Sequence, residues 1–511
     1  MSHMVRGDKY SRAIAVACSV FLIVIVAFLT IVSFLKPQDN LIPKSLIVTT
    51  AVATLLEIAV FYVWVRFVAV KKPGLNAWVF RIGLILYSVF LFVINVLFRT
   101  QKGLYDYSIL MDGADSIANN RPFGVIWYFE KEKQQFKPAL FLGLIKRICQ
   151  RINIDDYYAC LLFSILLVVS CVLAVRYLVS DSKAVRDKYQ CVVLALFVLY
   201  VPIVYYVSFF YTDMYSFGLG VVAIAVFRYA CRYAKRTWLG LIQAICAGVI
   251  LGFGITEKVT SSIPVIAFVI VFCVRLNRKA LVRAVCMAGA CVALLVLTTQ
   301  AARGYEIYRA TDTKAVPIVH WLAVGLQGDG TLQYQSEYNE KMLELETTEE
   351  ISVLAKEYLK ENIGNLYNIN HYIDKTRVIF AAGTANAKQA VADLGADKNL
   401  IESFFCYSGK HYWRSCVYMF SYMFSLWIII LVGAVRATVG VIRAKKSDFL
   451  LTFAQLSLIG MYIFFMMWEA NSRQLFNQMP MVILCAVLCF KLFDKTGETN
   501  ISDSENLEII V

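Results

Sequence analysis

The chain has 511 residues, of which 59% are hydrophobic and only 17% are charged, and its mean hydropathy is +0.63. These values lie well above the apolar share of soluble domains and exclude a water-soluble fold. The formal charge of +14 suggests nucleic acid at first sight, but lysine and arginine are scattered through short connections between apolar runs. Membrane orientation explains that pattern, and we expect no nucleic-acid partner.

Twelve apolar runs are long enough to cross a bilayer, since a spanning helix needs about 20 residues. They cover residues 11–35, 45–70, 78–98, 157–178, 189–207, 213–230, 237–256, 260–276, 281–302, 411–435, 448–468 and 476–493. The sequence therefore predicts an all-α polytopic membrane protein with about twelve transmembrane helices.

These runs divide the chain into six parts. They are three N-terminal transmembrane helices (1–98), a first extracytoplasmic loop (99–156), six transmembrane helices (157–302), an extracytoplasmic segment (303–410), three C-terminal transmembrane helices (411–493) and a tail (494–511). We expect the segment 303–410 to be a small, mainly helical domain that covers the bundle.

The basic residues indicate the orientation, because positively charged short loops stay on the cytoplasmic side. Alternate connections carry eighteen lysines and arginines on one side of the membrane and four on the other. Both termini should therefore be cytoplasmic, and the long segments 99–156 and 303–410 should lie outside.

The first outer loop contains an amphipathic stretch around Pro138, whose apolar residues recur at three-to-four-residue spacing. The stripe is formed by Phe136, Leu140, Phe141, Leu144, Ile145, Ile148 and Ile152, and the other face carries Lys137, Lys146, Arg147 and Arg151. A helix of this kind lies in the headgroup plane of a membrane. The alternative is an ordinary amphipathic helix packed on the outer domain.

Six ionisable residues stand at the mouths of the predicted spans or loops, all on the outer side. They are Asp106, Asp213, Lys258, His320, Glu469 and Arg473. Ionisable groups at such places are costly, so they tend to face the bundle interior, to pair and to mark a site. We expect them to meet in one pocket.

Members of this set also have purely structural interpretations. Asp213 can cap a helix. Lys258 and Arg473 can anchor helix ends by extending toward the headgroups, and His320 can be an interfacial side chain beside Trp321. The presence of both charge signs on one face favours a site, because independent anchors need not be acidic and basic together.

A lipid phosphate suits this set of charges. Lys258 and Arg473 can hold a phosphate at headgroup depth, because arginine gives two-point contact and lysine a point charge. A nearby carboxylate can then deprotonate an acceptor hydroxyl as it attacks the sugar, and the departing phosphate needs no separate general acid. Asp106, Asp112 and Asp115 lie close together in the sequence and compete for this role.

The sequence contains no nucleotide-binding loop, no strand-turn-helix phosphate site and no His/Cys cluster at metal-ligand spacing. An activated donor should therefore come from the membrane. No cofactor is required by the sequence, and a requirement for a divalent cation is left open.

Several short motifs resemble those of the polytopic GT-C glycosyltransferases, a class that includes protein O-mannosyltransferases and the aminoarabinose transferases of lipid A. The nearest likeness is to bacterial members of the Gram-positive type. The matching stretches are Asp106-Tyr-Ser-Ile-Leu-Met-Asp-Gly-Ala-Asp-Ser-Ile-Ala118, Trp127-Tyr-Phe129, Phe210-Tyr-Thr-Asp213, Lys258, Pro317 to Gly325, and Met467-Trp-Glu-Ala-Asn-Ser-Arg473. By this resemblance Asp106 is the catalytic carboxylate.

The chain departs from the family pattern at three places. Tyr107 follows Asp106 where many members have a glutamate, and Gln474 follows Arg473 where a tyrosine is usual. Glu132-Lys133 replaces a usual Tyr-Pro pair.

The resemblance implies a multi-pass enzyme of the bacterial plasma membrane that acts on the cell envelope. It would move a sugar from a polyprenyl-phosphate donor to a hydroxyl of a cell-surface glycan, lipid or protein, with inversion. The implied site has Asp106 and Asp213 as catalytic residues, Lys258 and Arg473 as donor-phosphate ligands, and His320, Glu469 and Tyr128 as substrate-binding residues. The alternatives are a polytopic transporter or lipid flippase, and a membrane scaffold without catalytic activity.

Overall fold

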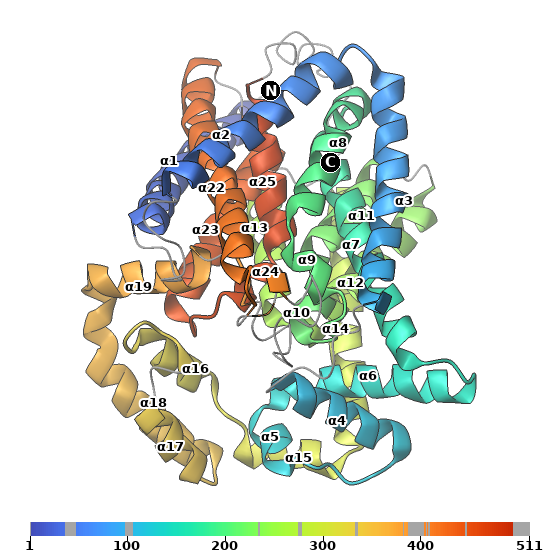
Figure 1. The fold of residues 1–511 in the computed structure, drawn as a ribbon, viewed down its shortest axis with the longest axis vertical. Coiled ribbons are helices and arrows are strands. Elements are labelled where there is room, and N and C mark those ends of the chain that lie inside the picture. Colours follow the sequence, from blue (N-terminus) through green and yellow to red (C-terminus); the bar gives the residue numbers. More distant parts are fainter. Residues whose placement is uncertain are drawn as a thin grey trace.

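The structure is a computed structural model that describes residues 2–35, 47–97, 106–233, 236–273, 278–332, 336–381, 383–386, 403–404, 406, 409–444 and 447–493. Over these residues the regular secondary structure is entirely helical, as predicted (Figure 1). The fold is a bundle of long helices with a set of shorter helices at one end.

Nine helical segments of the described chain are long and apolar enough to cross a membrane, and each coincides with one predicted span. They lie in α1 (Ser2–Leu35), α2 with a π-helical end (Ile47–Ala69), α3 (Pro73–Leu97), α7 (Asp156–Leu178), α10 with α11 (Thr212–Tyr233), α12 (Thr237–Glu257), α14 (Arg278–Arg303), α22 (Tyr412–Ala444) and α23 (Phe449–Met467). The chain is therefore an integral membrane protein by the length and composition of its helices.

Over their described residues, the other three predicted spans, 189–207, 260–276 and 476–493, fold as shorter, interrupted helices. The pairs are α8 (Lys183–Leu199) with α9 (Pro202–Tyr206), η3 (Val259–Ser262) with α13 (Ile263–Cys273), and α24 (Arg473–Phe476) with α25 (Met479–Lys491). At Pro202 the interruption has a local cause, since proline lacks the N–H that would continue the helix and fits best at a helix start.

A fourth interruption separates α10 (Thr212–Tyr215) from α11 (Leu219–Tyr233), and a glycine makes it possible. Gly218 has φ +60°, a conformation that favours glycine, and a Cβ there would lie 2.6 Å from both Cys171 Sγ and a Pro480 side-chain carbon. This turn thus packs directly on α7 and α25 and fixes the position of α10.

The shorter helices gather at the same end of the bundle although they come from two distant parts of the chain (Figure 1). The first group is α4 (Asp106–Asn119), α5 (Ile126–Lys131) and α6 (Lys133–Arg151), and the second is α15 (Glu306–Lys314), α16 (Ile318–Leu326), α17 (Ser336–Glu344), α18 (Thr348–Asn362) and α19 (Ile369–Phe380). We refer to this end of the bundle as the loop end.

Lys131 fastens the two groups to each other. Its Nζ donates to the carbonyl oxygens of Met342, Leu343 and Leu345 at 3.1, 3.2 and 2.7 Å. The Lys131 carbonyl in turn accepts a hydrogen bond of 2.9 Å from the Val316 amide. Segments about two hundred residues apart thus form one layer over the bundle.

Helix α6 crosses the bundle end in this layer (Figure 1). On its predicted apolar stripe Phe136 and Leu140 are buried in the protein, whereas Leu144, Ile148 and Ile152 are exposed. The helix therefore packs on its neighbours and also presents apolar side chains outward, a combination compatible with both sequence interpretations.

Candidate functional site

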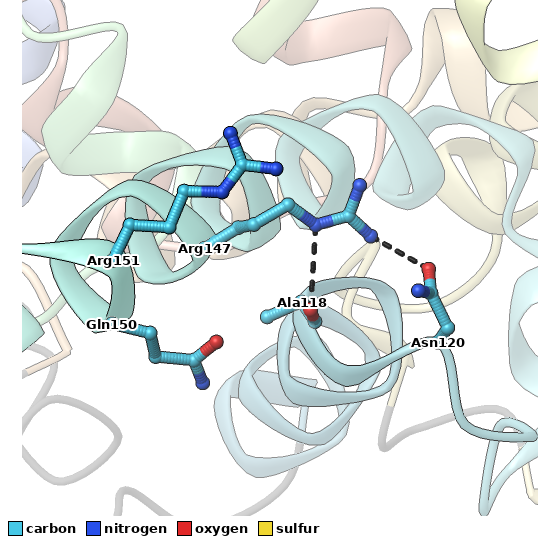
Figure 2. A pocket seen from close by; sticks show the side chains of 5 residues that line it. All are labelled: Ala118, Asn120, Arg147, Gln150 and Arg151. Atoms are coloured by element: carbon cyan, nitrogen blue, oxygen red, sulfur yellow. Dashed lines mark hydrogen bonds between the residues drawn. The ribbon is translucent and has the colours of Figure 1, made fainter.

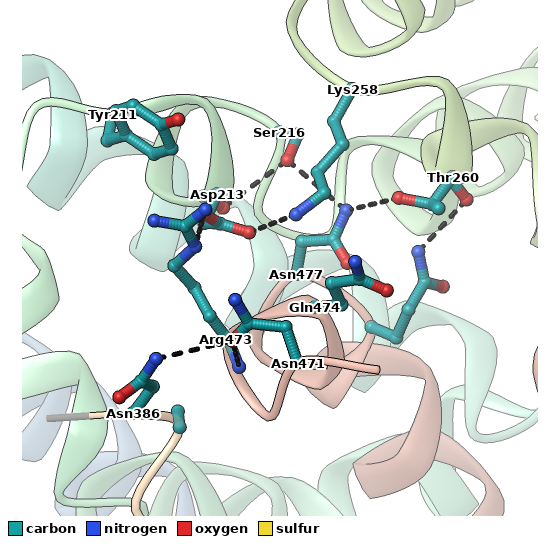
Figure 3. A network of polar contacts seen from close by, with 12 residues as sticks. Tyr211, Asp213, Ser216, Lys258, Thr260, Asn386, Asn471, Arg473, Gln474 and Asn477 are labelled. Carbon is teal, nitrogen blue, oxygen red and sulfur yellow. Dashed lines mark hydrogen bonds and ion pairs between the residues drawn. The ribbon is translucent and has the colours of Figure 1, made fainter. Parts of the chain in front are cut away.

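Arg473 joins two carboxylates from distant helices, Asp213 and Asp106, and Figure 3 shows the contact with Asp213. Its Nε lies 3.1 Å from Asp213 Oδ2, and a terminal guanidinium nitrogen lies 3.8 Å from Asp106 Oδ2. Arg473 is the first residue of α24, and its amide donates a 3.1 Å hydrogen bond to Asn471 Oδ1. The turn after α23 therefore sets the direction of the arginine.

Asp213 is the centre of the cluster and has an exposed side-chain fraction of 0%. It lies in the first turn of α10 and does not cap that helix, because the N-cap position is Tyr211. Instead it pairs with two cations, since Lys258 Nζ donates to Oδ1 while Arg473 approaches Oδ2. A buried carboxylate of this kind is tolerated only with close opposite charges.

Lys258 reaches the cluster because the chain turns sharply at the end of α12. Its backbone is extended (φ −157°, ψ 120°), so the helix ends there and the side chain extends to Asp213. Burial lowers the pKa of Lys258, and the charge of Asp213 partly opposes that effect. A negatively charged ligand would favour the protonated form further.

Tyr211 connects Asp106 to the rest of the site. Its hydroxyl lies 3.4 Å from Asp106 Oδ2 and accepts a 2.9 Å hydrogen bond from Gln135 Nε2. The guanidinium carbon of Arg473 lies 4.8 Å from the centre of the Tyr211 ring, within the range of a cation–π contact. Sequence reasoning missed Tyr211, although it stands only two residues before Asp213.

Two further carboxylates surround Asp106. Burial, followed by the charge of Asp106, raises the pKa of Glu132 to about 8, while a hydrogen bond from Gln134 acts in the opposite direction. Burial also raises the pKa of Glu469, while the charges of Arg473 and Lys258 oppose this rise. A pKa of about 8 favours a protonated Glu132 at neutral pH, which its sequence context did not reveal.

Among the four ion-paired residues of this cluster, Asp106 has the most exposed side chain, at 43%. The other two acids of α4 are placed differently. Asp112 is exposed to solvent, and Asp115 forms an ion pair of 2.5 Å with Lys146 of α6. Of these three acids, Asp106 is the one that the described contacts join to Arg473.

Tyr128 lies beside this cluster, whereas His320 lies elsewhere. Burial, together with Tyr211 and the charge of Asp106, raises the pKa of the buried Tyr128 hydroxyl. His320 Nδ1 lies 2.7 Å from the Tyr338 hydroxyl, and burial lowers the pKa of the imidazole to about 4. Among the described contacts, those of His320 stay within the helices of the second group.

Next to the charged cluster, side-chain amides form hydrogen bonds with polar groups at the helix interruptions (Figure 3). Asn477 Nδ2 donates to Ser216 Oγ at 3.2 Å and to Thr260 Oγ1 at 2.8 Å. Gln478 Nε2 donates to the Thr260 carbonyl at 2.9 Å, and the Gly218 amide donates to the Asn477 carbonyl at 3.0 Å. Three helix interruptions thus meet at one place, where their free backbone groups find partners.

A pocket of about 350 Å³ lies away from this cluster, at the end of α4 (Figure 2). It is lined by Ala118, Asn120, Arg147, Gln150 and Arg151. Arg147 donates to the carbonyls of Ile117 and Ala118 and to Asn120 Oδ1 at 2.5, 3.3 and 2.7 Å. Because these are the last acceptors of a helix, Arg147 stabilises the α4 terminus.

The acids of the cluster do not form a metal site within the described residues, where no group of three or more His, Cys, Asp or Glu side chains is arranged to hold an ion. A requirement for a divalent cation stays a prediction.

The long apolar helices and the buried ion pairs at the loop end define a polytopic integral membrane protein with a charged site at one end of its bundle. Residues 7–492 match the family model described as "Conserved hypothetical integral membrane protein", and the chain belongs to this family. Neither a comparison with curated proteins nor one with solved structures found a match.

Proposed function

We propose that this protein is an integral membrane glycosyltransferase that moves a sugar from a polyprenyl-phosphate donor to a hydroxyl of a cell-surface acceptor, with inversion. The supporting observation is that Arg473 contacts both a fully buried carboxylate, Asp213, and an accessible one, Asp106. In this proposal the loop end faces outward from a bacterial plasma membrane, in agreement with the distribution of lysine and arginine along the sequence.

Lys258 and Arg473 have donor capacity left for a phosphate. An ammonium carries three N–H donors and a guanidinium five. Lys258 uses one on Asp213. Arg473 faces Asp213 through Nε and approaches Asp106 through one terminal nitrogen at 3.8 Å, which leaves terminal N–H donors for a phosphate. Asp213 would act as a buried counter-ion that holds both cations in place while phosphate oxygens occupy their outer side.

Asp106 would be the general base. It accepts the proton of the acceptor hydroxyl, the hydroxyl oxygen bonds to the anomeric carbon, and the bond from that carbon to the phosphate oxygen breaks. Tyr211 and Arg473 orient the Asp106 carboxylate, and Tyr128 and Glu469 lie nearby for contacts with the sugar. His320 takes no part in this proposal, because its described contacts stay among the loop-end helices.

The substitution Asp106→Asn tests the base. Purified protein in nanodiscs would be offered a panel of polyprenyl-phosphate sugars, and transfer should fall by about 100-fold or more, the usual contribution of a general base. Binding of the donor should persist, because the cations are untouched. Asp112→Asn, on the same helix and solvent-exposed, is the matched control. Full transfer by the Asp106→Asn protein would remove Asp106 from this role and make Asp213 the next candidate.

A transporter or lipid flippase is the second candidate, and the interrupted helices favour it. Transporters of several folds bind their substrate where spans are broken, and here the interruptions near Ser216, Thr260 and Asn477 lie directly under the charges. Proteoliposomes loaded with a fluorescent polyprenyl-phosphate lipid distinguish the two functions. Lipid movement without any sugar transfer would favour the flippase, whereas transfer without movement would favour the enzyme.

A further inference from the structure

A buried lysine of the loop-end layer is attached to the turn that carries the proposed site. Lys375, in α19, has 0% exposure. Its Nζ donates to the carbonyls of Gly325, Met466 and Trp468 at 2.7, 2.9 and 2.5 Å. These acceptors match the three donors of an ammonium group, so the contact is saturated and directional.

The acceptors belong to two segments that are pressed together. A Cβ at Gly325 would collide with main-chain atoms of Met467 and Trp468, so only glycine allows this approach. The Ala470 amide then donates a 2.7 Å hydrogen bond to the Gly330 carbonyl, and Gly330 itself has φ +76°. The turn 466–473 is thus docked on residues 325–330, with Lys375 at the centre of the junction.

We propose that Lys375 is a positioning residue, which docks the turn 466–473 against the loop-end helices and so places Glu469 and Arg473 in the charged site. The turn leaves α23 at Trp468 and reaches Arg473 only five residues later. Because this connection is short, a movement of the main chain at Trp468 would also displace Arg473. The role of this placement in sugar transfer rests on the proposed function, whereas the docking itself does not.

The surroundings of Lys375 bear on its charge. Burial lowers the pKa of Lys375 from 10.5 to about 7, and the charges of Glu469 and Asp329 oppose this shift. The three carbonyl acceptors also favour the ammonium form, because only that form has three N–H donors. His371 lies one turn earlier on α19 and contacts the Gly328 carbonyl at 2.8 Å.

Hydrogen exchange of the full chain in nanodiscs tests the docking without any substrate. In Lys375→Met, amides of the turn 466–473, Ala470 among them, should exchange about tenfold or more faster, as expected for the loss of hydrogen bonds from a charged donor. The exposed Lys356→Met of α18 is the matched control and should leave this exchange unchanged. Unaltered protection of the turn in Lys375→Met would overturn the proposal.

The wild-type protein supplies a second measurement if Lys375→Met does not fold. The Ala470 amide, which donates to the Gly330 carbonyl across the junction, should exchange at least about tenfold more slowly than an unstructured amide. Exchange at the unstructured rate would contradict the docked turn on which the proposal depends.

A binding experiment then separates this inference from the proposed function. Decaprenyl phosphate is the probe, and its dissociation constant is measured for wild type, Lys375→Met and Arg473→Gln. Weaker binding in both variants supports positioning of the site. If Arg473→Gln binds the probe as wild type does, the proposed phosphate site is wrong, while faster exchange in Lys375→Met would still establish the docking.

Discussion

Two arginines of the loop end, Arg473 and Arg147, sit in contrasting surroundings. Arg473 faces the carboxylates of Asp213 and Asp106, whereas Arg147 faces main-chain carbonyls and an amide oxygen at the end of α4. The pocket volume lies beside Arg147, and the concentration of buried charge lies beside Arg473. The comparison teaches that the partners of an arginine indicate its role. An arginine that faces carboxylates can bind an anionic ligand in their place, whereas an arginine that hydrogen-bonds to the last carbonyls of a helix stabilises that helix end.

The largest loss of stability in the Arg473 region is expected when its buried counter-ion, Asp213, is removed. Asp213→Ala leaves Lys258 and Arg473 close together without their shared carboxylate. We expect a loss of about 3–5 kcal/mol in the free energy of unfolding, the usual cost of uncompensated buried charge. Thermal unfolding in detergent measures it. Glu337→Ala, which removes the acid of the exposed pair Glu337–Lys341, is the control and should change stability far less, because solvent screens an exposed pair. Equal losses in both variants would show that burial of Asp213 has no special weight.

The same substitution at both arginines compares their contributions to phosphate binding and to stability. Arg473→Gln should weaken binding of decaprenyl phosphate by about 2 kcal/mol, in the range for a charge-assisted hydrogen bond. Arg147→Gln should leave this binding unchanged, because its partners are the carbonyls of Ile117 and Ala118. It should instead lower stability by about 1–3 kcal/mol through the α4 terminus. Isothermal titration and thermal unfolding of both variants give the four values. Weaker binding of decaprenyl phosphate in Arg147→Gln, together with unchanged binding in Arg473→Gln, would place the phosphate site beside Arg147.

An effect that depends on pH is expected at Glu132, the acid beside Asp106 whose pKa is raised. Its pKa of about 8 in the folded protein exceeds its ordinary value of 4.5, so its contribution to stability is present below pH 4.5 and is lost as the pH rises through 8. Glu132→Gln mimics the protonated form and should raise the melting temperature at pH 8.5 but not at pH 5. Glu130→Gln, whose carboxylate pairs with Lys314, should not show this pH pattern. A melting temperature of Glu132→Gln that follows wild type at both pH values would show that the folded protein does not raise the pKa of Glu132.

Hydropathy alone was enough to predict the nine long spans, because a continuous apolar run of membrane length leaves little choice of structure. It could not predict the interruptions at 200–202, 216–218 and 477–478, which lie inside apolar sequence. Pro202 and Gly218 were local signals for two of them. At Asn477 the interruption depends on partners in α10–α11 and η3, and these are known only from the fold.

The candidate site was predictable for charged residues that stand at the mouths of the predicted spans and loops. Asp106, Asp213, Lys258 and Arg473 stood out for this reason, and the structure places them in contact. Tyr211 and Lys375 could not be found in this way, because a tyrosine near a span and a lysine in a polar helix are ordinary in sequence. Their importance comes from contacts across more than ninety residues.

The hydrogen bonds of Lys131 to residues 342–345 have a practical consequence for engineering. In a chimera that exchanges only one of the two loop-end groups with a related protein, Lys131 would lose the carbonyl partners that match its position. Functional hybrids should therefore require residues 106–151 and 306–380 to be exchanged together.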